Sequence, residues 1–103
     1  MNKRQRLTPE ARTAEILTAA VAQAKRNGLR KLTRSSVAKA AGVSDSLVSL
    51  HFGRVEDLRD EVMKVAVREK ILPIIAEGLA DGNKHARKAP VAVRTAAAKT
   101  LYA

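Results

Sequence analysis

The sequence contains no cysteine, and aromatic residues make up only 2% of its 103 positions. The missing thiols exclude a disulfide framework and a cysteine-ligated zinc site. Modules that stack bases of RNA or single-stranded DNA need several aromatic faces, so one Phe and one Tyr argue against them. No apolar run approaches the length of a membrane span. We therefore expect a cytoplasmic protein with no membrane partner, no metal and no cofactor.

Acidic residues are scarce as well: 20 Lys and Arg face 10 Asp and Glu, which gives a net charge of +10. Such a balance favours a polyanionic partner. The charge is uneven, because residues 34–58 hold three basic and three acidic side chains while the segments on either side are strongly basic. Basic segments on both sides of a neutral one suit a protein whose basic side chains contact DNA phosphates while the neutral surface contacts the base edges. A generally basic, solvated surface is the simpler alternative.

The apolar pattern predicts a small all-α fold of five or six helices, without strand-like alternation. Thr8-Pro9-Glu10 begins a first helix, and Asn27-Gly28 ends it. A longer helix is expected from Val55 until Pro73 ends or kinks it. The remaining segments are predicted as a short helix ending at Asp81-Gly82-Asn83, a basic loop at Lys84–Ala89 and a last helix from Pro90 to about Leu101.

The stretch from Leu32 to Phe52 predicts two short helices joined by a tight turn. Thr33 and Ser44 can cap them, and Gly42 supplies a turn position where positive φ carries no Cβ penalty. Phe52 is expected to close the motif against the first helix as a core side chain. This arrangement is typical of the DNA-binding helix-turn-helix. Many small helical domains share such caps, so the pattern alone does not establish DNA binding.

The outer face of the second motif helix carries the candidates for base readout: Asp45, Ser46, Leu47 and Ser49. A carboxylate can accept from a cytosine amino group, and a leucine can pack on a thymine methyl. Arg34 and Ser35 open the first motif helix, where backbone N–H groups suit a phosphate, although both can equally be plain solvent-facing residues.

Residues 1–7 form a basic arm that we expect to be flexible. Lys3, Arg4 and Arg6 could follow the DNA backbone or enter an adjacent minor groove. A solubilising tail is an equally good interpretation.

Residues 12–58 resemble the DNA-binding domain of the tetracycline-repressor (TetR) family of bacterial transcription regulators. The matching residues are Arg12, Ile16-Leu17, Ala19-Ala20, Gly28, Leu32-Thr33, Val37-Ala38, Ala41-Gly42-Val43-Ser44, His51-Phe52, Glu56 and Leu58. The resemblance implies a reading helix at Asp45–Leu50, double-stranded DNA as partner, a palindromic operator and a homodimer. It also implies a phosphate contact at His51, for which a cap or core-edge imidazole is the alternative.

Three departures from the family pattern stand out. Ser49 and Leu50 replace a usual Tyr and an adjacent aromatic or His, and Val55 replaces a Lys that meets a phosphate. Arg54 could take over that contact, so the expected phosphate contacts are Thr33, Arg34, Ser35, His51 and Arg54. The segment after Leu58 is also too short for the family's ligand-binding domain, so no small-molecule inducer is expected.

The expected organisation is a basic arm (1–7), a DNA-binding domain (8–58) and linking and C-terminal helices (55–103). Apolar residues beyond Pro73 are expected to form a two-fold dimer contact, or alternatively to pack within one subunit: Ile74, Ile75, Leu79, Val93, Ala97 and Leu101. The predicted function is a sequence-specific regulator of transcription, bacterial or phage and most simply a repressor. The alternatives are a module that binds an acidic protein and a sequence-tolerant architectural DNA binder. No nucleophile or paired carboxylate suggests an enzyme.

Overall fold

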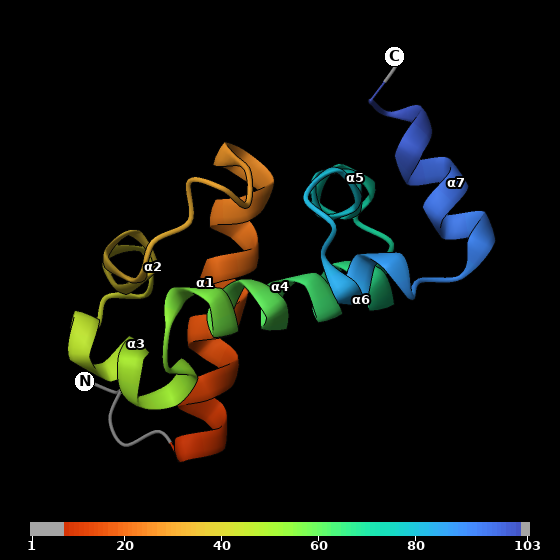
Figure 1. Ribbon diagram of the computed structural model, residues 1–103. Helices are drawn as coiled ribbons and strands as arrows, with labels where there is room; N and C mark the ends of the chain where they lie inside the picture. The colour runs from red at the N-terminus through yellow and green to blue at the C-terminus, as the bar shows by residue number, and fades with distance from the viewer. Residues whose placement is uncertain (1–7, 102–103) are drawn as a thin grey trace.

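The computed structural model describes residues 8–101, and within that range the chain forms helices and no strand (Figure 1). The all-α class predicted from the sequence is confirmed. The basic arm with Lys3, Arg4 and Arg6 lies outside the described residues. The seven helices of this range are α1 (Pro9–Asn27), α2 (Arg34–Ala41), α3 (Asp45–Phe52), α4 (Val55–Glu69), α5 (Leu72–Ala80), α6 (Lys84–Arg87) and α7 (Val91–Lys99).

The ends of α1 follow the predicted chemistry. The Thr8 hydroxyl accepts the backbone N–H of Ala11 at 3.0 Å, which satisfies one of the unpaired donors of the first turn. At the other end Gly28 turns the chain with φ 92°, a conformation that costs other residues a steric penalty. The predicted bounds of this helix are therefore confirmed.

The long helix α4 ends earlier than predicted. Lys70 adopts the left-handed conformation (φ 57°), and the N–H of Ile71 donates back to the carbonyl of Ala66 at 2.9 Å. Pro73 lies in the first turn of α5, where its missing N–H costs nothing. Pro73 thus starts a new helix, and Lys70 is the residue that terminates α4.

The predicted basic loop at Lys84–Ala89 is wrong, because its first four residues form the short helix α6. Asn83 caps this turn, with its side-chain oxygen accepting the N–H groups of His85 (2.9 Å) and Ala86 (3.1 Å). Ala86 is fully buried. The Asn83 cap and the packing of α6 on α4 and α5 therefore order a single turn that the propensity of the segment does not reveal.

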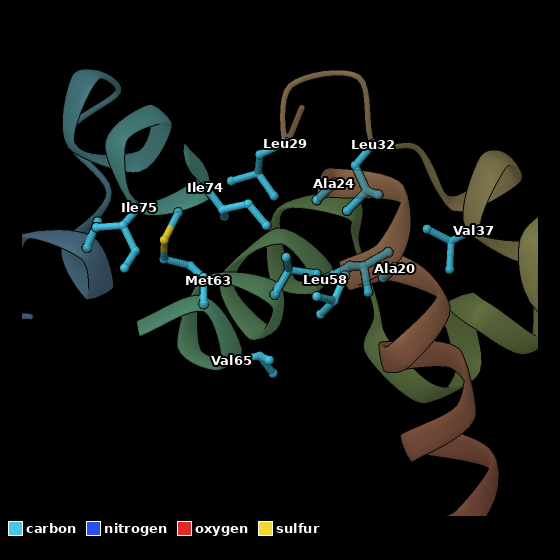
Figure 2. Packing of buried hydrophobic residues seen from close by; sticks show 14 of the residues in the cluster. Ala20, Ala24, Leu29, Leu32, Val37, Leu58, Met63, Val65, Ile74 and Ile75 are labelled. Carbon is cyan, nitrogen blue, oxygen red and sulfur yellow. The ribbon is translucent and has the colours of Figure 1, made fainter. Parts of the chain in front are cut away.

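The helices make an elongated molecule of 46 × 21 × 20 Å. Figure 1 shows α1 and α4 in the middle, with α2 and α3 at one end and α5–α7 at the other. One hydrophobic cluster runs through all of it and joins the two ends. Its largest fully buried side chains are Ile16, Leu32, Val37, Val48, Leu58, Val62, Met63, Ile74 and Ile75, several of which are labelled in Figure 2.

Phe52 contributes less to the core than predicted. Its ring packs against the cluster but is only half-buried, whereas Val48 on the same helix is fully buried. Because part of the ring remains in solvent, Phe52 contributes less to the stability of the motif than a fully buried ring would.

No helix within residues 8–101 combines the length and the apolar character needed to cross a membrane.

Candidate nucleic-acid interface

Local hydrogen bonds fix the start of α2 and the start of α3, on either side of the turn that joins them. The Thr33 hydroxyl accepts the N–H of Ser36 at 3.0 Å, and the Ser36 hydroxyl in turn accepts the N–H of Thr33 at 3.1 Å. This reciprocal pair is a capping box. Gly42 then takes a left-handed conformation (φ 72°), and the Ser44 hydroxyl caps α3 by accepting the N–H of Leu47 at 3.1 Å. The predicted caps and turn are confirmed.

The outer face of α3 carries two of the predicted readout residues and one that the sequence reasoning missed. Asp45 and Ser46 are exposed. Leu50 is 79% exposed, and it shares the face of Ser46 because residues four apart lie one above the other on a helix. An apolar side chain so open to solvent is available to pack on a thymine methyl. Its place in the family pattern, where an aromatic or His is usual, was the signal that could have identified it.

Leu47 and Ser49 are less accessible than predicted. Leu47 is half-buried and packs against the core, so it offers little surface to a base. Ser49 is also half-buried, and its hydroxyl accepts a hydrogen bond from the Arg34 guanidinium at 2.7 Å. The outward apolar position of α3 is therefore Leu50 rather than Leu47.

The Arg34–Ser49 hydrogen bond joins the start of α2 to the middle of α3. Arg34 is exposed, and one of its five N–H donors is occupied by Ser49. The remaining donors can meet a phosphate beside the reading helix, where a planar guanidinium suits the oxygens. Among the predicted phosphate contacts, Arg34 is the one that is exposed and is also held beside α3 by a hydrogen bond.

His51 connects α3 to α1. Its Nδ1 atom lies 2.7 Å from the Thr13 hydroxyl, which also lies 2.9 Å from the carbonyl of Pro9. A hydroxyl has one proton, so when Thr13 donates to Pro9 the Nδ1 atom of His51 must be the donor to Thr13. The contact with Thr13 therefore holds His51 and α3 against α1, and the phosphate contact of His51 stays a prediction.

The other predicted phosphate contacts lie around this face. Thr33, Ser35 and Arg54 are all exposed. Thr33 uses its hydroxyl oxygen to cap α2, so only its proton remains for a phosphate. Arg54 immediately precedes α4, where its backbone N–H donates to Asp57 at 3.1 Å. The side chains predicted to contact DNA phosphates are therefore accessible at this face, but they are few in number.

The dimer residues predicted from the sequence divide into two groups. Ile74, Ile75 and Ala97 are at most 1% exposed, so the expectation that they contact a second subunit is wrong in this conformation. They belong to the core because α5 packs on α4 and α7 packs on α5. Leu79 and Val93 are half-buried against the cluster, and Leu101 is 52% exposed.

One apolar side chain of α7 was not anticipated. Val91 is 67% exposed and lines a shallow hollow of about 320 Å³ together with Leu79, Arg94, Thr95 and Ala98. A second hollow, of about 410 Å³, lies between α1 and α4 and is lined by Leu17, Val21, Val65 and their neighbours. The first hollow is lined by residues of α5 and α7 and the second by residues of α1 and α4. Within residues 8–101, no group of three or more His, Asp or Glu could hold a metal ion.

Comparison with known proteins agrees with this geometry. Residues 16–62, from the buried part of α1 to the middle of α4, match the family described as "Bacterial regulatory proteins, tetR family". No curated protein and no solved structure matches the chain. The matched family consists of DNA-binding regulators and is not a family of enzymes. Residues 16–62 thus form a TetR-family helix-turn-helix DNA-binding domain.

Proposed function

We propose that the protein is a sequence-specific regulator of transcription, most simply a repressor, that binds duplex DNA in the cytoplasm through the outer face of α3. The observation that supports this most strongly is the exposed set Asp45, Ser46 and Leu50 on a capped helix within the matched domain. The set combines an acceptor, a hydroxyl and an apolar group, which are the kinds of groups that distinguish base edges in the major groove.

Exchange of these side chains should change which base is preferred. We expect Asp45→Ala and Ser46→Ala to lower the preference at one or two positions of the site by about 1–3 kcal/mol each. Binding measured against a panel of single-base variants tests this. Lys39→Ala, at an exposed position of α2, is the control and should leave the preferences unchanged. If Asp45 and Ser46 variants rank the panel as the parent does, α3 does not read the bases.

Removal of Arg34 should have a different signature. Arg34→Ala is expected to weaken binding to all sequences alike, and to reduce the slope of log K against log salt by about one, because one phosphate contact is lost. Titration of one duplex at several salt concentrations measures that slope. Ser49→Ala removes the partner of Arg34 and keeps the charge, so its slope should match the parent's. An unchanged slope for Arg34→Ala would show that Arg34 serves only to orient α3.

We further propose that the protein acts as a homodimer on a palindromic site, because one reading helix contacts few base pairs. The exposed apolar side chains left for this contact are Val91 and Leu101 of the α7 region, with Leu79 and Val93 beside them. Figure 1 shows α3 and α7 at opposite ends of the molecule. A contact through α7 therefore favours half-sites separated by more than one helical turn of about 34 Å.

We propose that no small-molecule inducer gates the binding. The residues after α4 form short helices packed on α4 and on each other, and they supply little wall for a closed pocket. Binding of an acidic protein by the same surface is the alternative function. It is favoured by the small number of phosphate contacts, and a folded protein that does not bind duplex DNA even at low salt would support it.

A further inference from the structure

Side chains from α4 and α5 hold the loop that joins α1 to α2. The Glu77 carboxylate of α5 accepts the backbone N–H of Leu29 at 2.6 Å and that of Arg30 at 2.8 Å, one on each oxygen. Both N–H groups lie just beyond the end of α1, where no helical carbonyl is available to them. Bonds between an ionised carboxylate and backbone N–H groups are among the stronger hydrogen bonds in proteins.

Arg59 of α4 binds the same loop through its carbonyls. Its Nη2 atom donates to the carbonyl of Arg30 at 3.2 Å and to that of Leu32 at 3.0 Å. Its Nε atom is buried and has no hydrogen-bond partner. An unpaired buried donor costs free energy, so this side-chain position is partly destabilising in itself. The loop is thus bound through its N–H groups by α5 and through its C=O groups by α4.

An exposed ion pair adds a third contact. Arg30 donates to Asp81 at 2.6 Å, and this hydrogen bond lowers the pKa of Asp81 below its ordinary value of 3.8. A lowered carboxyl pKa means that the contribution is present at neutral pH and is lost as the pH falls through that pKa. The same partner raises the pKa of Arg30, so that side loses its proton only in strong alkali. Both side chains are open to solvent, so the pair adds little.

Beneath these polar contacts the loop is anchored by apolar packing. Leu29 is 5% exposed and Leu32 is 2% exposed. Figure 2 shows Leu29 pointing toward Ile74 of α5, and Leu32 pointing toward the α1 side of the same cluster. The loop is therefore packed against α5 as well as against α1.

We propose that Glu77 and Arg59 are positioning residues for DNA binding: they fix the loop from Gly28 to Leu32 and thereby set where α2 begins. Thr33, the cap of α2, directly follows the carbonyl that Arg59 holds, and Arg34 follows Thr33. Arg34 is bonded to α3 through Ser49, so a displaced loop displaces both the phosphate contact and the reading helix. Glu77 lies beyond Val62, the last residue of the family match, so the C-terminal helices contribute to the DNA-binding end. The inference rests on the proposed function.

Glu77→Ala provides the test, because the loss of a negative charge and the loss of the loop contact should change the affinity for DNA in opposite directions. Removing a carboxylate from a protein of net charge +10 should by itself tighten binding to DNA. Glu69→Ala, which removes an exposed carboxylate that has no ion pair within the described residues, is the matched control and should bind as tightly as the parent or slightly tighter. Glu77→Ala is expected to bind the preferred duplex about 5- to 20-fold more weakly, because the loop contacts that place Arg34 and α3 are lost.

Two further measurements separate positioning from a loss of folding. Affinities are corrected for the folded fraction, determined by denaturant titration in the binding buffer. Amide hydrogen exchange should be faster at Leu29 and Arg30 in Glu77→Ala, and intermediate in Glu77→Gln, which retains one acceptor oxygen. Asp81→Asn should change the affinity less than twofold.

The outcomes are distinct. A parent protein without preference for any duplex removes the proposed function, and this inference with it. A parent that binds selectively, with a Glu77→Ala variant of the same corrected affinity, overturns the inference alone and leaves Glu77 a purely structural residue. Weaker binding of the preferred duplex by Glu77→Ala, together with faster exchange at the two amides, supports it.

Discussion

Ile75→Asp is expected to unfold the C-terminal helices rather than to separate two subunits. Ile75 is fully buried, and Figure 2 shows it near Met63 of α4. A carboxylate at this position would be buried without a partner, which costs about 3–5 kcal/mol in addition to the lost apolar contacts. Small domains have only about 5–15 kcal/mol of stability in total. Circular dichroism during thermal and denaturant unfolding should show a large loss of stability.

Leu101→Asp is the matched control. Leu101 is 52% exposed, so the same change there should alter the free energy of unfolding by no more than about 0.5 kcal/mol. If the α7 region forms the dimer contact, Leu101→Asp should nevertheless shift the sedimentation of the protein toward the monomer. An Ile75→Asp protein as stable as the parent would contradict the packing of α5 on α4.

Leu58→Ala is expected to cost about 2–5 kcal/mol of stability. Leu58 lies in the first turn of α4, is fully buried, and appears in the middle of the labelled cluster in Figure 2. The cluster there includes residues of α1 and of the loop before α2, so the cavity left by truncation cannot be closed by one side chain. Denaturant unfolding followed by circular dichroism measures the loss.

Leu50→Ala, which also truncates a leucine, should have the opposite profile. Leu50 is mostly in solvent, so its removal should leave the stability within about 0.5 kcal/mol of the parent. Its loss should weaken discrimination at a thymine instead. If Leu58→Ala melts like the parent, or if Leu50→Ala is the less stable of the two, the assignment of inner and outer faces is wrong.

The local chemistry of the helix ends could be predicted from the sequence. Thr8, Thr33 and Ser44 cap three helices, and Gly42 makes the turn between the motif helices. Such signals depend on residues within one turn of each other, so a single sequence contains all the information they need. The helix-turn-helix and its bounds follow from them.

Properties that depend on packing at a distance could not be predicted in this way. An apolar stripe at Ile74, Ile75 and Ala97 is compatible with a core or with an interface, and only the docking of α5 on α4 decides for the core. The contact between Glu77 and the loop joins residues 48 positions apart. No local pattern marks Glu77 as different from any other helical glutamate.

The choice between Leu47 and Leu50 shows that a small error in the predicted rotation of a helix changes which residue faces outward. Both leucines lie on α3, and a rotation of the helix about its axis exchanges which one faces outward. The structure turns Leu47 toward the core and leaves Leu50 outside. Periodicity over eight residues does not define that rotation closely enough.

Selection of bound sequences from a random pool of duplex DNA, at moderate salt, tests the central claim most directly. Because α3 presents Asp45, Ser46 and Leu50 outward on a fixed motif, the protein should enrich one defined sequence. We expect it to contain two inverted half-sites. A pool that remains random after several rounds, although the folded protein retains DNA at low salt, would contradict sequence-specific reading by α3.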